Sequence, residues 1–391
     1  MLTPDYLFNC TDRIVEIYEQ LQTFAVTDIA RRIAKMGTIT DTAQFQIWQA
    51  QQAGLHYEEI LKRVSKLTGM SQAEVKRLFE EAGTQSLKFD DSIYKCAGLN
   101  PIPISQSPQM LSVLEALYRQ TNGELQKFTR SIALDSQKTF FASSDKAYME
   151  ISSGMSDYIS AISRSVRETA TDGIQVIDYA SGSRISVEAG VRRAVLTGVN
   201  QGAAKLTEAR ADEMGCDLVE TTKHANARPD HARWQGGIYS LSGKSTKYRK
   251  LSDATGYGTV TGLCGANCRH SFSPFILGIS EPNETQYNPE EVKKAYDLSQ
   301  KQRGMERRIR NTKRELNATD VASKTASSDV AAKLKEDYQN QAVKLKRQRI
   351  EYETFCRENR LKTQAERTQI PGFSRSEASR ATAAARKKAE G

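Results

Sequence analysis

The apolar positions of the N-terminal region recur with helical spacing. Between residues 57 and 67 they follow the three- and four-residue spacing of one helix face: Ile60, Leu61, Val64 and Leu67. The stretch 68–71 combines a glycine with a serine that can cap a new helix, so it predicts a break. Gly83 suits the residue just after the end of that second helix. We therefore predict a helical hairpin over 57–83, within a helical region spanning 1–97.

A helical hairpin with a short glycine turn also has the outline of a DNA-binding helix-turn-helix. Its second helix would offer polar and basic side chains to a groove: Gln72, Lys76 and Arg77. The same helix carries acidic residues that would repel phosphate: Glu74, Glu80 and Glu81. A helix-turn-helix protein therefore stays an alternative to a plain hairpin.

Prolines separate the first helical region from the next. Residues 98–108 hold three of the nine prolines, which indicates an extended linker. Helical periodicity then resumes at Met110 and continues to about Thr169. The segment 98–171 is therefore predicted to be a linker followed by helices.

After Gly173 the pattern changes to strands. Apolar residues on both sides of the turn 181–183 predict a β-hairpin: Ile174, Val176, Ile177 and Tyr179 before it, and Ile185 and Val187 after it. A long helix is expected from about 186 to 214, ending at Gly215. Short strands are expected at 218–222, 237–241 and 272–275, around a loop-rich stretch from 223 to 270. We predict a small α+β core over 172–280.

The last third of the chain is charged and helical. The stretch 288–291, Asn-Pro-Glu-Glu, is a clear helix start. Two long helices are predicted at about 289–316 and 329–366, separated by the polar stretch 317–328. The apolar stripe of the second is narrow: Val330, Leu334, Tyr338, Ala342 and Leu345. It suits a helical hairpin or a helix docked on a partner, and the extension spans 281–370.

The residues that follow, 371–391, are small and basic, and we expect them to be mobile. The fold class predicted from these patterns is mostly α with a small α+β core.

The charge of the chain is concentrated at its end. The 391 residues hold 56 Lys and Arg against 47 Asp and Glu, a net charge of +9. Residues 281–391 hold 25 basic and 17 acidic residues, a net of +8, which leaves +1 for the rest. Such a basic segment favours an anionic partner, most often nucleic acid. Mixed charges on an exposed helix can also serve solubility alone, and that interpretation stays open.

Composition excludes a membrane protein. The mean hydropathy is −0.58, and no window approaches 18 uninterrupted apolar residues. The start of the chain has neither the basic nor the apolar region of a secretory signal, so we expect no leader. Six cysteines with a single close pair do not form a disulfide framework, which indicates synthesis in a reducing cytoplasm.

One window concentrates residues that can bind a metal. His231, Cys264, Cys268 and His270 contain a C-x3-C-x-H run and could close a tetrahedral zinc site, with His224 as a substitute ligand. The spacing is not that of a standard zinc finger. These residues could instead hold a polar loop cluster by hydrogen bonding, with cysteine acting as a small apolar residue. We predict a structural site with zinc as its possible metal.

Catalytic interpretations of the same window are weaker. His231 beside Asp230, with a cysteine nucleophile, could form a hydrolase site, and Asn267 with His270 has some similarity to zinc-supported nucleases. No nucleophile elbow, Walker loop or dinucleotide fingerprint occurs. We assign no catalytic residue, and a metal-dependent nuclease or other DNA-processing protein stays the alternative.

Two stretches resemble a known family. HANARPDHARWQGGIYSLSG at 224–243 and TGYGTVTGLCGANCRHSFSPFILGIS at 255–280 are similar to the phage minor capsid protein 2 family of tailed phages and prophages of Gram-positive bacteria. More distantly, Asn267-Cys268-Arg269 resembles a motif of the F-like head morphogenesis proteins of phage Mu.

The resemblance implies a structural virion protein that is not an enzyme. It implies a place in the phage head, synthesis in the host cytoplasm, and partners among the portal and the other head or scaffold proteins. It also implies contact with packaged DNA in some relatives. Some relatives carry a zinc-like arrangement at the corresponding positions, matched here by His231, Cys264, Cys268 and His270.

Overall fold

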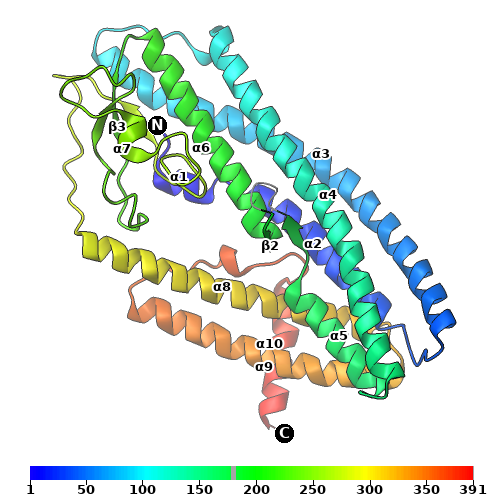
Figure 1. Ribbon diagram of the computed structural model, residues 1–391. Coiled ribbons are helices and arrows are strands. Elements are labelled where there is room, and N and C mark those ends of the chain that lie inside the picture. The colour runs from blue at the N-terminus through cyan, green and yellow to red at the C-terminus, as the bar shows by residue number, and fades with distance from the viewer. Residues whose placement is uncertain (178–181, 391) are drawn as a thin grey trace. The chain divides into compact units, whose positions relative to one another are not determined.

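Helices dominate the computed structural model, which describes residues 1–177 and 182–390 (Figure 1). The helices are α1 (Pro4–Asn9), α2 (Asp12–Ile33), α3 (Thr42–Cys96), α4 (Pro108–Ser152), α5 (Tyr158–Asp172), α6 (Val187–Glu213), α7 (Leu251–Thr255), α8 (Pro289–Ser323), α9 (Ser328–Glu358) and α10 (Arg375–Glu390). Two 3₁₀ turns are η1 (Ile104–Gln106) and η2 (Glu366–Thr368). The strands are β1 (Gln175–Ile177), β2 (Arg184–Ser186), β3 (Leu218–Thr221), β4 (Ile238–Ser240) and β5 (Phe272–Pro274). The predicted fold class, mostly α with a small α+β part, is confirmed.

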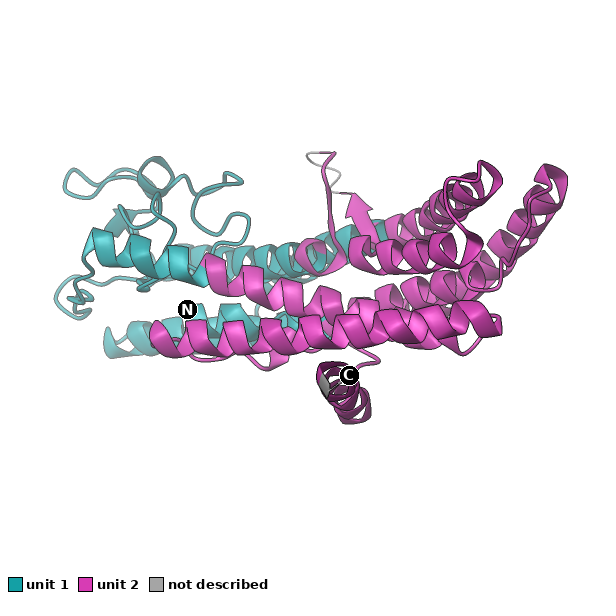
Figure 2. Cartoon of the chain, turned by 90° about the horizontal axis from the view of Figure 1, so that it is seen from below, with its two compact units in different colours: residues 1–15, 69–127, 191–299 teal, residues 16–68, 128–190, 300–391 magenta. Residues whose placement is uncertain are grey.

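The chain groups into two units, each built from three separate stretches (Figure 2). Unit 1 contains residues 1–15, 69–127 and 191–299, and unit 2 contains residues 16–68, 128–190 and 300–391. The five consecutive segments expected from the sequence follow changes of composition instead, and they stay a prediction. Among the described residues, no helix is long and apolar enough to cross a membrane.

The predicted hairpin at 57–83 is wrong, because α3 runs without a break through 68–71 and past Gly83. Ser71 is buried rather than placed at an exposed cap. A glycine inside a helix costs only about 1 kcal/mol relative to alanine, so tertiary packing overrides the local turn signal. At Gly83 a side chain would meet methyl groups of Leu114 and Leu206 at 3.1 Å, which shows close packing. The helix-turn-helix alternative requires a turn in this segment, and α3 contains none between Thr42 and Cys96.

In unit 1 a three-stranded antiparallel sheet carries the candidate site. Its strand order is β4-β3-β5, with Val219 opposite both Tyr239 and Pro274. All three strands were predicted from the sequence. The sheet packs in one apolar cluster with residues of α6, α7 and the loops: Ala204, Val219, Trp234, Tyr239, Leu251, Leu263, Cys264 and Phe272. Helix α6 ends at Glu213, and Gly215, at φ +66°, follows it at the position where the sequence predicted the end of the helix.

In unit 2, β1 and β2 form the expected hairpin, with Val176 opposite Ile185. The hairpin positions Tyr179 and Ser181 lie outside the described residues. Arg184 pairs with Asp135 of α4, and the Ile177 amide donates to Ser131 Oγ at 2.9 Å. These contacts join the hairpin to α4.

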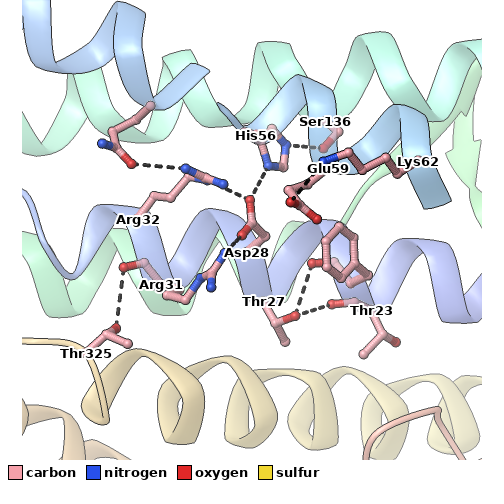
Figure 3. Close-up of polar contacts among 12 residues, drawn as sticks. Thr23, Thr27, Asp28, Arg31, Arg32, His56, Glu59, Lys62, Ser136 and Thr325 are labelled. Carbon is pink, nitrogen blue, oxygen red and sulfur yellow. Dashed lines mark hydrogen bonds and ion pairs between the residues drawn. The ribbon is translucent and has the colours of Figure 1, made fainter. Parts of the chain in front are cut away.

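A buried polar network joins α2, α3 and α4 in unit 2 (Figure 3). His56 Nδ1 lies 2.7 Å from Asp28 Oδ2, and His56 Nε2 lies 2.6 Å from Ser136 Oγ. Asp28 also accepts hydrogen bonds from Arg31 and from Arg32. All the partners of Asp28 are donors, so its charge is satisfied. Because His56 of α3 contacts both Asp28 of α2 and Ser136 of α4, the network fixes the relative positions of these three helices.

Most of the C-terminal helical segment, residues 300–391, groups with unit 2. Glu315 of α8 pairs with Lys344 of α9 at 3.1 Å, which confirms the expected helical hairpin. Ser163 of α5 donates to Asp337 of α9, so the hairpin also packs on an earlier part of the chain. The predicted polar break at 317–328 is shorter than expected, because α8 continues to Ser323.

Most of the segment expected to be a mobile tail is helical, and its mobility stays a prediction. Residues 375–390 form α10, which packs into a cluster with α8 and α9: Ile309, Leu316, Ala342, Leu345, Tyr352, Cys356, Ile370, Phe373, Ala381 and Ala385. Alanine has the highest helix propensity, and the small side chains allow close approach to α9. Helix α9 ends at Glu358, before the expected 366, and Gly391 lies outside the described residues.

Candidate metal centre

Three of the four predicted ligands meet in unit 1. His231 lies in the loop between β3 and β4, whereas Cys268 and His270 lie just before β5. Asn200 of α6 donates through Nδ2 to the carbonyl of Cys268 at 3.1 Å and to that of His270 at 2.9 Å. Asn200 therefore holds the segment that carries Cys268 and His270 against α6.

The three side chains form a closed cluster. His231 Nδ1 lies 3.4 Å from His270 Nδ1 and 3.6 Å from Cys268 Sγ, and Cys268 Sγ lies 3.8 Å from His270 Nδ1. Their exposed fractions are 2% for His231, 2% for Cys268 and 1% for His270. Nitrogen and sulfur donors at such separations suit a zinc-type ion, and burial suits a structural site.

Cys264 lies at the edge of the cluster. Its Sγ donates to the carbonyl of His270 at 3.6 Å, but Cys264 is not part of the group whose ligand atoms all lie within 4.8 Å of one another. Cys264 has a backbone φ of +58° and belongs to the apolar cluster beneath the sheet. As placed, it is a neighbour of the three-residue cluster.

His224, the substitute ligand, stacks on His270 with 4.2 Å between ring centroids. Its Nδ1 lies 3.0 Å from Asn226 Oδ1. Its Nε2 is buried and has no hydrogen-bond partner among the described residues. A buried polar atom without a partner is costly, so His224 Nε2 lacks the hydrogen bond or metal contact that would offset its burial beside the cluster.

The network assigns the proton on His270. Gln235 Oε1 accepts from the backbone N–H of His224 at 2.9 Å, which identifies that atom as the amide oxygen. His270 Nε2 lies 3.2 Å from the same oxygen and therefore carries the proton. His270 Nδ1 is left with a lone pair directed into the cluster, as a metal ligand requires.

His231 has two alternative proton arrangements, and each leaves one neighbour of Nε2 without a hydrogen bond to it: Arg228 in the first and the carbonyl of Thr261 in the second. In one, Nε2–H donates to the carbonyl of Thr261 at 2.8 Å, and Nδ1 presents a second lone pair to the cluster. Two lone pairs 3.4 Å apart repel each other unless a cation lies between them. In the other arrangement, Arg228 donates to Nε2 and Nδ1–H donates to His270 Nδ1, so no metal is needed. The residues fit a metal, and the two states differ by the proton on His231 Nδ1.

Burial controls the titration of these groups. It lowers the pKa of His270 well below its ordinary value, with the nearby His224 as the next cause. Burial, assisted by Arg269, lowers the pKa of His224 to about 4. Burial raises the pKa of the Cys268 thiol. Without a metal, the histidines are therefore neutral and the thiol is protonated at neutral pH.

These values give little support to a cysteine nucleophile, which needs a thiolate. Asp230, the expected partner of His231, is half exposed, and its Oδ2 lies 3.9 Å from His231 Nε2. Asn267 contributes a backbone turn at φ +58°. The geometry supports binding and packing more than catalysis.

Sequence reasoning missed the aligned Ser136, His56 and Asp28 of unit 2. Their order resembles a hydrolase triad. All three are buried, and the backbone amides of α4 around Ser136 bond within their own helix, so these amides are not free to stabilise an oxyanion. Three distant helices supply them, and no local spacing could have indicated the group.

Comparisons with known proteins agree with the resemblance seen at 224–243 and 255–280. A structural protein of Lactococcus phage LL-H is 31% identical over 121 residues, covering 30% of this chain and 32% of the relative. A structural protein of Lactococcus phage mv4 is 34% identical over 67 residues, covering 17% of this chain and 54% of the relative. The chain thus matches about a third and about half of the lengths of these relatives.

No solved structure matches the chain significantly. The family of phage minor capsid protein 2 matches residues 2–355, which is most of the sequence and includes most of both units and the whole Cys and His cluster. The chain therefore belongs to the phage minor capsid protein 2 family.

Proposed function

We propose that this protein is a non-enzymatic minor component of the phage head, made in the host cytoplasm and incorporated beside the portal during assembly. The observation that carries the proposal is the family match over 2–355. The relatives from two Lactococcus phages are likewise named structural proteins. Portal and other head or scaffold proteins are the proposed partners.

Exposed apolar side chains support a role in assembly. In unit 2, Ile47 and Met149 are 61% and 66% exposed, and Met155 is 74% exposed. Single exposed apolar residues are ordinary, but large ones on long helices, as Ile47 and Met149 are, and in the turn after α4, where Met155 lies, offer contact area to neighbouring subunits. They are consistent with a protein that buries more surface within a larger particle.

The C-terminal helices are proposed to contact packaged DNA. Several of their cations are exposed and form no ion pair with the described residues: Lys335, Lys346, Arg347 and Lys387. Many other cations of the segment are used internally, as in the pairs Arg310–Glu188 and Arg380–Asp320. The net attraction for an anion therefore depends on a smaller set than the sequence indicated.

We also propose that His231, Cys268 and His270 bind a structural zinc ion, with Cys264 or His224 as the fourth ligand. When bound, the ion would join the β3–β4 loop to the segment before β5 by direct ligation. His270 would be held in the required tautomer by Gln235. The role is structural, because the cluster is closed to solvent and a catalytic zinc needs an open position.

The experiment that tests the function is quantitative mass spectrometry of purified phage heads. The chain should be present at a low, fixed ratio to the portal protein, and co-expressed portal should co-purify with it. Absence from purified heads, together with absence of portal binding, would overturn the proposal. DNA degradation by the pure protein in Mg²⁺ or Zn²⁺ that is lost in His231→Ala would contradict the non-enzymatic role.

A further inference from the structure

A single loop of unit 1 carries four exposed cations and no acidic residue. This loop, residues 242–250, connects β4 to α7 and reads SGKSTKYRK. Its cations are Lys244, Lys247, Arg249 and Lys250, all exposed. Among the residues that the structure describes, none of the four forms an ion pair. The C-terminal helices differ, because acidic residues run through them and pair with many of their cations.

The loop is held in one shape by its own backbone and hydroxyl groups. The Ser240 amide donates to the carbonyl of Arg249 at 2.9 Å, which closes the loop at its base. Ser245 Oγ accepts from the amide of Tyr248 at 3.0 Å. Gly243, at φ +74°, has no Cβ, and a Cβ there would meet Lys250 Cδ at 2.9 Å. The stem of Lys250 therefore lies against the start of the loop, close to Lys244.

The acidic groups nearby are already engaged. Asp217 accepts from Ser240 Oγ at 2.6 Å and from the Ser242 amide at 2.8 Å, so it anchors the base of the loop. Glu208 pairs with Lys205 at 2.8 Å. An open groove of about 660 Å³ lies between the loop and α6, and Asp212 lines its α6 side. A polyanion is therefore favoured on the outer side of the loop and disfavoured in the groove.

We infer that the 242–250 loop is a second nucleic-acid contact, which binds the phosphate backbone of DNA without reading its sequence. This inference rests on the proposed contact with packaged DNA and places part of it in unit 1. Closely spaced Lys and Arg neutralise successive phosphates and release counterions. Hydroxyl groups and Tyr248, half-buried beneath Lys247, add donors of the kind that contact phosphate. No rigid element presents side chains for base readout, so affinity should not depend on sequence.

The test compares two charge-matched variants of the full chain. The loop variant combines Lys244→Gln, Lys247→Gln, Arg249→Gln and Lys250→Gln. The helix variant combines Lys335→Gln, Lys346→Gln, Arg347→Gln and Lys387→Gln, and it also removes three lysines and one arginine. Fluorescence anisotropy of a short labelled DNA duplex of arbitrary sequence is measured over a range of salt concentrations, with circular dichroism and melting to verify folding.

We expect the loop variant to lose roughly tenfold or more in affinity at low salt. Its slope of log K against log salt should become shallower by up to about 4, one for each lost phosphate contact. A charge-retaining variant, with lysine and arginine exchanged at the same four positions, should bind like the wild type. A second duplex of unrelated sequence should give the same losses.

The outcomes separate this inference from the proposed function. Loss in the loop variant supports the inference, whether or not the helix variant also loses affinity. Loss in the helix variant alone overturns it and leaves the C-terminal contact. Unchanged affinity in both variants overturns both DNA contacts, while head membership is judged separately by mass spectrometry. A loop variant that binds DNA normally but no longer enters heads would assign the loop to a protein partner and overturn the inference.

Discussion

At the scale of single residues, the side chains of the candidate metal centre are almost completely buried. His231 and His270 face each other through Nδ1 because Thr261 and Gln235 accept hydrogen bonds from the opposite ring nitrogens in the metal-binding arrangement. Positioning by such outer partners determines which nitrogen can bind a metal. The arrangement therefore makes specific predictions about metal content.

Purified protein should contain zinc, and Cys268→Ser or His231→Ala should release it. Because a structural metal contributes its binding energy to folding, these changes should lower the melting temperature by roughly 5 °C or more. Elemental analysis and thermal melting are the measurements. Cys356→Ser is the matched control, since Cys356 is a buried thiol in the other unit and should leave metal content unchanged. Metal-free wild-type protein whose melting is insensitive to chelator would contradict the site.

A second prediction concerns Asp28. Burial acts to raise its pKa, but hydrogen bonds from His56 and Arg32 outweigh it, and the pKa lies below its ordinary value of 3.8. The carboxylate therefore stabilises the fold above that value, and the contribution is lost as the pH falls below it. Asp28→Asn should reduce the free energy of unfolding at neutral pH by about 3–5 kcal/mol, because it leaves buried donors unpaired.

Urea unfolding at neutral and acidic pH tests this. The Asp28→Asn protein should lose less stability on acidification than the wild type does. Glu59→Gln on α3 is the control, because its carboxylate is exposed and makes only a long contact of 3.7 Å with Lys62. Equal stability of Asp28→Asn and Glu59→Gln would show that the network in Figure 3 does not stabilise the fold.

At the scale of elements, the continuity of α3 is the largest departure from expectation. A Thr-Gly-Met-Ser stretch with a capping serine is a local turn signal, yet α3 passes through it for 55 residues. Packing of its faces along the helix outweighs a local preference of about 1 kcal/mol. Gly69 itself is exposed, and nothing lies within 4 Å of the position its Cβ would take.

Gly69→Ala should therefore stabilise the protein by about 0.5–1 kcal/mol, since alanine is the better residue inside a helix. Denaturant unfolding is the measurement. Gly83→Ala is the comparison, because its methyl group would crowd Leu114 and Leu206 and should give no gain. Destabilisation by Gly69→Ala would instead indicate a turn with positive φ at that position.

The packing of α10 makes the next prediction. Ala381 is 3% exposed, whereas Ala383 of the same helix is exposed. Ala381→Glu should destabilise the protein by about 2–4 kcal/mol because it buries an unpaired charge, and Ala383→Glu should be nearly neutral. Limited proteolysis should cut the Ala381→Glu tail faster. Identical cleavage of the two variants would support a mobile tail.

The elements that sequence predicted well are those with strong local signals. Asn288 Oδ1 accepts from the Glu290 amide at 2.9 Å, as the Asn-Pro-Glu-Glu helix start indicated. The short strands were found because alternation and flanking glycines are also local. The break expected near Gly69 was wrong because packing along the whole of α3 outweighs the local turn signal. The proton arrangement of His270 was not predictable, since it depends on Gln235 from another loop.

At the scale of the whole molecule, the sequence suggested a nearly neutral body followed by a basic extension, but the two compact units do not follow this division. The net charge of +8 in 281–391 remains, but much of that segment belongs to unit 2 together with 16–68 and 128–190. Thr171 of α5 donates to Glu315 of α8 at 3.1 Å, which joins the early and late parts of the unit. The C-terminal third is therefore structural within its own unit.

Deletion of 300–391 should consequently destabilise unit 2. We expect faster amide hydrogen exchange in residues 158–172, which lose the partners that α8 and α9 supply. Exchange around the β4-β3-β5 sheet should change less, because none of its strands lies in unit 2. Unchanged exchange in 158–172 would show that residues 300–391 do not stabilise α5.

The discontinuous make-up of unit 1 has a consequence for how the protein is made. Ser271 Oγ donates to the carbonyl of Leu2 across 269 positions of the chain, so this contact forms only late in synthesis. Contacts of such long sequence range slow folding and leave apolar surface exposed in the meantime. A ribosome-bound chain that stops before residue 271 lacks both this contact and strand β5, so it should leave the edge of β3 unpaired and depend on chaperones. Timing at the ribosome, as well as affinity for partners, would then limit how many copies are ready when a head assembles.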